Sequence, residues 1–284
     1  MSVHIVMMLI PSMFINLINF YDLTASSLGL IFSISSFCFG LGSLPMSLLY
    51  NKYGPRVLLV FSQVGIFITA FLASNSQSIE SFAIFNIFLG LFASIHHPVS
   101  LTLISEVFDE NISKANAFHG VFGSLGVSIG PLLCYYAITN FDWQFSFFLI
   151  AIFNLIIAPI TYFVISKVKK KESLNMLDFK MGNQLKMLKI FSLISLIVGI
   201  VFTIFNTFIP SVFKVAIGEQ SNLYVSGILI CGIFGQVLSG FFGDKFNRIK
   251  LLSIVLMVLC PLFIATYFLS NFSLIAVSVL LAVF

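Results

Sequence analysis

Long runs of neutral, mostly apolar residues alternate with short clusters of charged residues along the whole chain. Eight runs each hold the roughly 20 apolar residues that a helix needs to cross a membrane; they span residues 1–21, 23–51, 57–79, 81–105, 115–141, 143–166, 190–213 and 220–243. A ninth run, 251–284, exceeds one crossing and contains the polar turn Ser270-Asn271-Phe272-Ser273. The pattern predicts nine membrane-spanning helices and the start of a tenth.

The composition agrees with this reading. Hydrophobic residues make up 59% of the 284 residues and charged residues only 8%, whereas a soluble domain carries about 25% charged residues. The apolar runs are also about twice as long as the alternating, roughly ten-residue strands of membrane barrels. The predicted fold class is therefore an all-α polytopic membrane protein.

The basic residues predict an orientation. The segments 51–56, 106–114, 167–189 and 244–250 contain all 14 Lys and Arg residues except Lys214. Because cytoplasmic loops are enriched in Lys and Arg, we expect a multi-pass protein of the cell (plasma or inner) membrane with a cytoplasmic amino terminus. The net charge of +4 then reflects topology and does not indicate a nucleic-acid partner.

The longest hydrophilic segment, 167–189, divides the chain into a six-helix bundle (1–166) and a partial second bundle (190–284). Two interpretations of this cytoplasmic segment remain open. Its apolar residues recur at helical spacing, as in an amphipathic helix on the membrane surface, but a solvated linker fits equally well. The spaced residues are Leu174, Leu177, Met181, Leu185 and Leu188.

An internal repeat links the two parts. Residues 47–56 read SLLYNKYGPR and residues 240–250 read GFFGDKFNRIK. In both, a small residue and three apolar residues precede an amide or acid, a lysine, an aromatic residue and a base. Position 244 lies 193 residues after position 51, a distance that suits two parallel six-helix repeats.

These loops resemble the signature of the major facilitator superfamily, G-x-x-x-D-R-x-G-R-R after helices 2 and 8. The second copy fits well except for Asn247, whereas the first has Ser47, Asn51 and Pro55 in place of a glycine, the acid and an arginine. The family has twelve helices in two six-helix repeats. The resemblance thus implies that this sequence, with nine to ten, is a fragment or a truncated reading frame.

Two further elements are similar to the family. Gly126, Gly130 and Pro131 match its G-x-x-x-G-P element in helix 5, and residues 142–145 match its W-R-x-x-F start of helix 6. Helix 4 has Asn86 where many proton antiporters have arginine. Proton antiport through that position is therefore not expected.

The repeated loops imply a cytoplasmic gate. By the resemblance, the acid or amide accepts hydrogen bonds from a helix amino terminus, and the bases pair with nearby acids. Plain anchoring of the topology by positive charge is the alternative. The predicted gate residues are Asn51, Lys52, Gly54, Arg56, Gly240, Asp244, Lys245 and Arg248.

Polar side chains inside predicted helices mark a candidate substrate path, because such groups face the bundle interior. The leading helices of each repeat and helix 4 line the central path in this family. The candidates are Ser12, Asn16, Asn19, Asn86, Ser94, His97, Thr203, Asn206 and Thr207. Hydrogen bonding between helices, without contact to a solute, is the competing interpretation.

Two histidines are candidates for a coupling proton, because imidazole titrates near pH 6.5. His96 and His97 are adjacent, so their side chains diverge by roughly 100° and only one can face the path squarely; we expect His97. His119 shares a helical face with Gly123, Gly126 and Gly130, which also suits a close helix-packing seam.

The sequence thus predicts a secondary active transporter of a small organic solute that works by alternating access, with a proton as the candidate coupling ion, and favours export slightly over uptake. A membrane sensor or scaffold that keeps the fold without transport is the rival hypothesis. No enzyme motif, cofactor site or metal site is expected, and the four cysteines fit small apolar fillers. The protein is expected to be a monomer.

Overall fold

The computed structural model describes residues 1–108, 112–165, 182–245, 248–265, 268, 275 and 277–281. Within these residues the chain is helical and contains no strand, which confirms the all-α prediction. The helices are α1 (Ser2–Ser12), α2 (Phe14–Tyr21), α3 (Ala25–Ser43), α4 (Met46–Ser74), α5 (Ile79–Ser94), α6 (His96–Val107), α7 (Ile112–Asn140), α8 (Trp143–Ile165), α9 (Gly182–Ile217), α10 (Ser221–Lys245) and α11 (Arg248–Ala265). A short 3-10 helix, η2 (Gly218–Gln220), connects α9 to α10.

The helices follow the predicted apolar runs in order. Six described helical stretches are long and apolar enough to span a membrane, or seven if the bent pair α1–α2 counts as one. One of the six, Ser192–Val237, contains parts of both α9 and α10, and the apolar part of α11, Ser253–Leu262, is shorter than a span.

Three breaks interrupt the predicted spans, and proline is close to each. The axes of α1 and α2 differ by 57° around Met13, two residues after Pro11. Helix α4 is broken at Gly54, whose φ of 76° suits glycine, and Pro55 then opens the next helical turn. Pro98 has no N–H to donate to the carbonyl of residue 94, and α5 gives way to α6 nearby.

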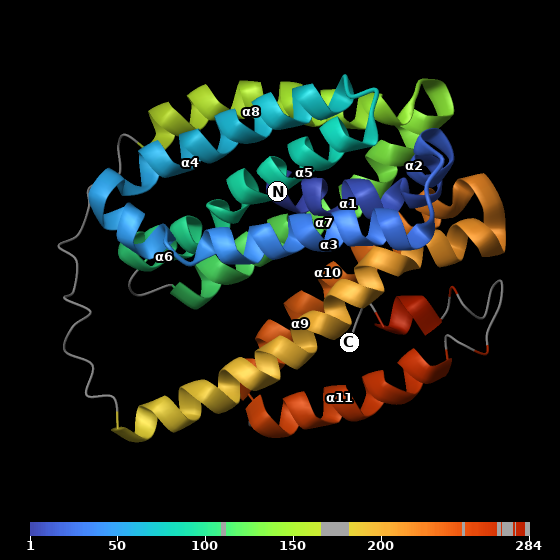
Figure 1. Cartoon of the computed structure of the whole chain (residues 1–284). Coiled ribbons are helices and arrows are strands. Elements are labelled where there is room, and N and C mark those ends of the chain that lie inside the picture. Colours follow the sequence, from blue (N-terminus) through green and yellow to red (C-terminus); the bar gives the residue numbers. More distant parts are fainter. Residues whose placement is uncertain are drawn as a thin grey trace.

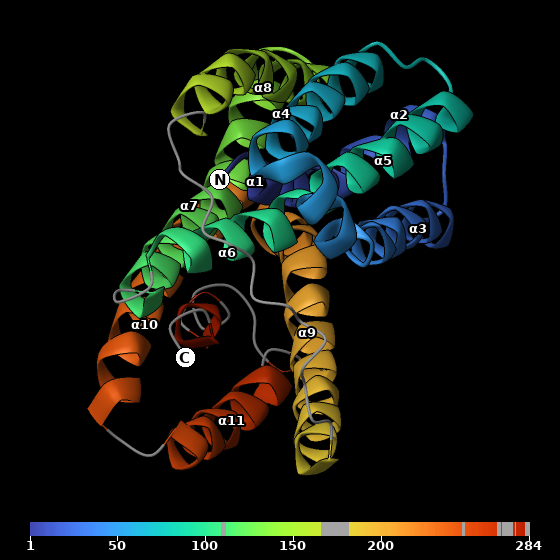
Figure 2. The same ribbon diagram turned by 90° about the vertical axis from the view of Figure 1, so that its left-hand side faces the viewer.

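Helices α1 to α8, here called the first helical group, pack around a large apolar core, and a smaller one lies between α4 and α6. Leu9, Ile66, Phe82 and Phe147 are fully buried in the large core. Helices α4 and α8 pack side by side along one edge, and α3 packs on α5, as both views show (Figures 1 and 2). Helix α1 lies inside the group against α7.

Trp143, the one tryptophan of the chain, begins α8 inside an aromatic cluster. Its ring centroid lies 5.3 Å from that of Phe20, 5.4 Å from Phe82 and 5.9 Å from Phe147, all edge to face. Only 5% of Trp143 is exposed. These contacts join α2, α5 and α8 at one end of the first helical group.

Helices α9 to α11, the second helical group, lie to one side of the first (Figure 1). Phe213 of α9 and Val225 of α10 are completely buried in a small core of their own. Helix α9 contacts α1, and α10 contacts α7. Toward its Gly182 end, however, α9 diverges from α3 and α6 in both views (Figures 1 and 2). Helix α9 thus meets the first group near η2, at the end here called the closed end, whereas α10 follows α7 as far as Gln236 and Gly120.

Helix α9 begins at Gly182, inside the segment 167–189 that the sequence predicts as a loop. Leu174, Leu177 and Met181 lie outside the described residues, so the choice between an amphipathic helix and a linker stays open. The predicted division of the chain into 1–166 and 190–284 likewise stays a prediction.

Large apolar side chains cover the outer surface. Val215 is 83% exposed and Phe163 66% exposed, and neither exposure would be favourable in water. A surface of this kind suits the hydrocarbon of a bilayer. It agrees with the lipid partner predicted from the composition.

Candidate functional site

A cavity of about 240 Å³ lies between the first helical group and α9. Helices α1, α3, α5, α7 and α9 all contribute to its wall. Apolar side chains cover most of it, and the polar lining residues are Ser35, Ser36, Asn86, Thr203, Asn206 and Thr207. Four of these six are predicted path residues. The structure thus brings Asn86 of α5 together with the three candidates of α9.

The α3–α5 contact positions Asn86. The hydroxyl of Ser35 donates to the backbone carbonyl of Asn86 at 2.7 Å, and the Asn86 amide donates to the carbonyl of Phe82 at 2.8 Å. Gly90 permits this approach, since a Cβ at position 90 would lie 2.6 Å from the Ser35 carbonyl oxygen. Asn86 is therefore held rigidly at the cavity wall.

The α9 side of the cavity carries an unused hydrogen-bond acceptor. The Asn206 amide nitrogen donates to the Phe202 carbonyl at 2.8 Å, and Thr207 donates to the Thr203 carbonyl at 2.7 Å. The Asn206 Oδ1 atom is buried and has no partner. Because a buried acceptor without a partner is costly, a donor group of a bound solute is the natural complement to this oxygen.

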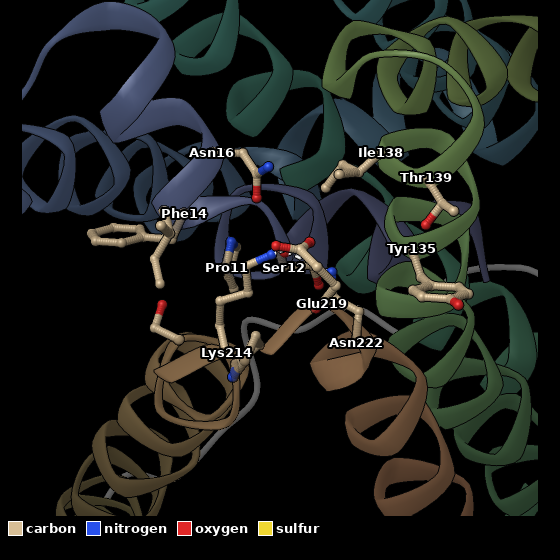
Figure 3. Close-up of a pocket in the computed structure, with 13 residues that line it drawn as sticks. Pro11, Ser12, Phe14, Asn16, Tyr135, Ile138, Thr139, Lys214, Glu219 and Asn222 are labelled. Atoms are coloured by element: carbon tan, nitrogen blue, oxygen red, sulfur yellow. Dashed lines mark hydrogen bonds and ion pairs between the residues drawn. The ribbon is translucent and has the colours of Figure 1, made fainter. Parts of the chain in front are cut away.

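A second, much smaller pocket of about 10 Å³ lies at the closed end (Figure 3). Ser12 and Asn16 line it from α1 and α2, and Lys214, Glu219 and Asn222 approach from the second helical group. Its volume suffices for about one water molecule. Pro11 lines both this pocket and the cavity, so it belongs to the wall between them.

Two buried hydrogen bonds join the helical groups near this pocket. The amide of Asn222 donates to the backbone carbonyl of Ser12 at 2.8 Å. Ser12 ends α1, and the last carbonyls of a helix have no partner within it, so Asn222 supplies the missing donor. The hydroxyl of Ser226 donates to the carbonyl of Ser128 in α7 at 2.7 Å. An ion pair between Lys214 and Glu219 lies beside them.

The structure does not bring the other path candidates to the cavity. The bend at Met13 turns α2 away, so that Asn16 lines only the small pocket and Asn19 is exposed. Ser94 is buried at the α3–α5 contact, where a Cβ on Gly42 would meet its hydroxyl. The spacing of Ser12, Asn16 and Asn19 predicts one face only for an unbroken helix.

His97 and His119 line neither the cavity nor the small pocket. They lie instead with His4 and His96, where α1, α6 and α7 meet. The sequence predicts that His97 faces the path, but the rings of both His96 and His97 lie in this other cluster. His4 and His96 are not among the residues predicted from the sequence. Comparing how deep each histidine lies in the membrane along its predicted helix would have grouped all four.

The first gate loop surrounds the break at Gly54. Asn51 and Lys52 are exposed, and the Lys52 ammonium lies 5.1 Å from the ring centroid of Tyr53. The Arg56 guanidinium lies over the ring of Tyr162 in α8, at 5.2 Å. Both contacts are cation–π geometries, and that of Arg56 joins α4 to α8.

A neighbouring contact escapes the sequence analysis. The hydroxyl of Tyr50, only 2% exposed, donates to the Glu106 carboxylate at 2.7 Å. This bond joins the start of α4 to the end of α6. No sequence signal pairs these two residues, because Tyr50 lies in the predicted run 23–51 and Glu106 in the charged segment 106–114.

The second gate loop is described only in part. Gly240, Asp244 and Lys245 belong to the last turns of α10, and Arg248 begins α11, whereas residues 246 and 247 lie outside the described residues. The gate role of both loops stays a prediction.

Comparisons with known proteins agree with this architecture. The chain is 22% identical over 155 residues to a bicyclomycin resistance protein homolog of Haemophilus influenzae, covering 54% of this chain and 39% of that protein. It is 22% identical over 258 residues to a probable nitrate transporter, NarT, of Staphylococcus epidermidis, covering 86% and 64%. The chain thus spans less than two thirds of the length of these relatives.

Two solved structures have a similar fold. The partially occluded inward-open xylose transporter XylE from E. coli superposes with a TM-score of 0.73 at 16% identity, over 99% of this chain and 80% of that one. The inward-facing bacterial homolog of the human lysosomal transporter Spinster gives 0.77 at 14% identity, over 99% and 69%. The family model of the Major Facilitator Superfamily matches residues 1–284. The chain therefore belongs to the major facilitator superfamily of membrane transporters.

Proposed function

We propose that this protein is a secondary active transporter of a small uncharged organic solute, working by alternating access and driven by a proton gradient. One observation carries the proposal: a cavity lies between two helical groups, and two buried hydrogen bonds join these groups toward the η2 end. Breaking those bonds would let the cavity open at the closed end. With the predicted cytoplasmic amino terminus, the closed end faces outward.

The lining of the cavity supports the solute class. Its polar groups are neutral amides and hydroxyls among apolar side chains such as Phe32 and Phe39. The volume of about 240 Å³ lies below the ~300–1,000 Å³ of pockets for drug-sized ligands. A small solute with hydroxyl or N–H donors fits this lining better than an anion such as nitrate. The Haemophilus relative is named for resistance to bicyclomycin, and export over uptake is part of this proposal.

Flux into proteoliposomes tests the proposal. The purified chain would be reconstituted with an imposed pH gradient and offered radiolabelled xylose, bicyclomycin and nitrate, with empty liposomes as the control. We expect gradient-dependent movement of an uncharged solute and none of nitrate. Absence of movement for a broad panel of small solutes would instead favour the sensor or scaffold hypothesis.

Replacing Asn206 with alanine is expected to weaken solute binding. Loss of one hydrogen bond between the solute and Oδ1 costs about 1 kcal/mol, which corresponds to roughly a fivefold rise in the apparent KM. Asn154→Ala is the matched control, since Asn154 has the same bond to its own helix, at 2.9 Å, and the same unpartnered Oδ1, but does not line the cavity. Equal KM values for the two variants would contradict this role.

A further inference from the structure

All four histidines of the chain meet at one place, where α1, α6 and α7 pack together. The ring centroids of His4 and His97 are 4.8 Å apart, and those of His96 and His119 are 5.8 Å apart and stacked. His97 lies 5.9 Å from His96 and 6.2 Å from His119. We call these four residues the histidine cluster.

Local backbone features place the rings. His96 and His97 open α6 next to Pro98, and both rings reach His119, although adjacent residues of a helix point about 100° apart. His4 fits against α7 because Gly123 has no side chain, and a Cβ there would lie 3.0 Å from His4 Nε2. Three helices that are distant in the sequence thus bring their imidazoles to the same depth.

The cluster has unused hydrogen-bonding capacity. His4 Nδ1 and His119 Nε2 are buried and have no partner. Ser100 approaches the His96 ring at 3.5 Å. Among the described residues, no group of three or more His, Cys, Asp or Glu side chains is arranged to hold a metal ion. Two imidazole nitrogens of the cluster, His4 Nδ1 and His119 Nε2, are thus free to accept or donate a hydrogen bond.

Each helix packed around the cluster brings a known set of charged, polar or aromatic groups to it. Helix α1 contributes His4, and the positively charged amino group of Met1 precedes it and repels a proton on any of the four rings. Helix α6 contributes His96 and His97, and α7 contributes His119. Helix α3 presents the Phe39 ring, 6.2 Å from that of His97, and α10 brings Gln236 near Gly120 of α7.

We propose that the four imidazoles bind one proton jointly and that this proton is the coupling ion of the transport cycle. The proton comes from water, adds to one ring nitrogen and leaves by the same bond. A second positive charge about 6 Å away would bind roughly 100-fold more weakly at an effective dielectric constant of about 20. Because α1 and α7 also carry the closed-end contacts with α10, a charge between them acts on the elements that must move. The role of this proton as the coupling ion rests on the proposed function.

Histidine NMR tests the shared site without any solute. Because the chain has only four histidines, selective isotope labelling of histidine reports on the cluster alone. In the full chain in lipid nanodiscs, we expect all four ring signals to shift in one common step, with a summed change equal to one imidazolium. Four separate and complete titrations, or no titration above about pH 5, would overturn the shared site.

A matched pair of variants sharpens this test. His97→Gln is expected to move the titration of the remaining three rings by about one pH unit. Ser105→Ala, an exposed change on the same helix α6, is expected to leave it unchanged. Unaltered signals in His97→Gln would show independent histidines and overturn the proposal.

A separate experiment measures whether protonation of the histidine cluster changes the conformation, with the proton as the probe. Spin labels at Asn19→Cys in α2 and Val215→Cys in α9, in a background where the four native cysteines are alanine, report the separation of the helical groups at the closed end. We expect their distance distribution to change between about pH 5 and 8, and not when all four histidines are glutamine. A pH response that survives in the glutamine variant would overturn the coupling. Failure of solute flux alone would overturn only the proposed function.

Discussion

Replacing Asn222 with alanine is expected to shift the protein away from the state in which its helical groups meet at the closed end. The substitution removes the donor to the Ser12 carbonyl and leaves that buried helix end unsatisfied, at a cost of about 1–3 kcal/mol. That cost corresponds to a roughly 5- to 150-fold change in the population ratio. The distances between spin labels at positions 19 and 215 measure it directly, as a larger fraction of long distances.

Asn140→Ala is the control for this experiment. Asn140 ends α7 at the same end of the molecule, is exposed, and its amide donates to the Tyr136 carbonyl of its own helix at 2.8 Å. It therefore removes a similar hydrogen bond that does not join the two groups. If the Asn222 and Asn140 variants gave the same distance distribution, the closed-end bond would have no part in the conformational equilibrium.

The second large effect is expected from Gly130→Ala, which should destabilise the first helical group. A Cβ at position 130 would lie 2.5 Å from the Met8 Cβ and 3.3 Å from the Ile5 carbonyl oxygen. Neither atom can move without the α1 backbone, so α1 and α7 must separate, at about 1–3 kcal/mol. The midpoint of thermal unfolding in detergent measures this loss.

Gly120→Ala provides the comparison on the same helix. The nearest atom to a Cβ at position 120 is Gln236 Oε1, at 3.8 Å, an ordinary contact. Alanine also favours helix over glycine by about 1 kcal/mol, so this variant should be at least as stable as the native chain. A Gly130 variant of native stability would mean that the α1–α7 contact is looser than the structure has it.

The helices could be predicted from the sequence because the membrane leaves few choices. Each crossing needs about 20 apolar residues with its backbone bonded internally, and the charged clusters fix where one crossing ends. Breaks inside a membrane helix are harder to predict from the sequence, since proline is tolerated there. Pro11 was visible, but nothing in the sequence required the 57° bend that separates Asn19 from Ser12.

The cavity could be predicted only where polar residues mark a face. Asn86, Thr203, Asn206 and Thr207 stand out in apolar helices, and the structure places all four at the cavity wall. Phe32 and Val127 do not stand out, because a helix that is apolar all round gives no sign of which side faces a solute and which faces lipid. Predicting the histidine cluster would have required a further step. The depth of each histidine in the membrane has to be compared between helices that run in opposite directions.

The position of Trp143 determines what an optical experiment on this protein can report. As the one tryptophan of the chain, it sits among Phe20, Phe82 and Phe147, wholly within the first helical group. Rotation of the second group against the first leaves these neighbours in place, so intrinsic fluorescence should stay constant through a turnover. The same signal should change sharply when the first group unfolds, which gives each variant a built-in measure of its integrity.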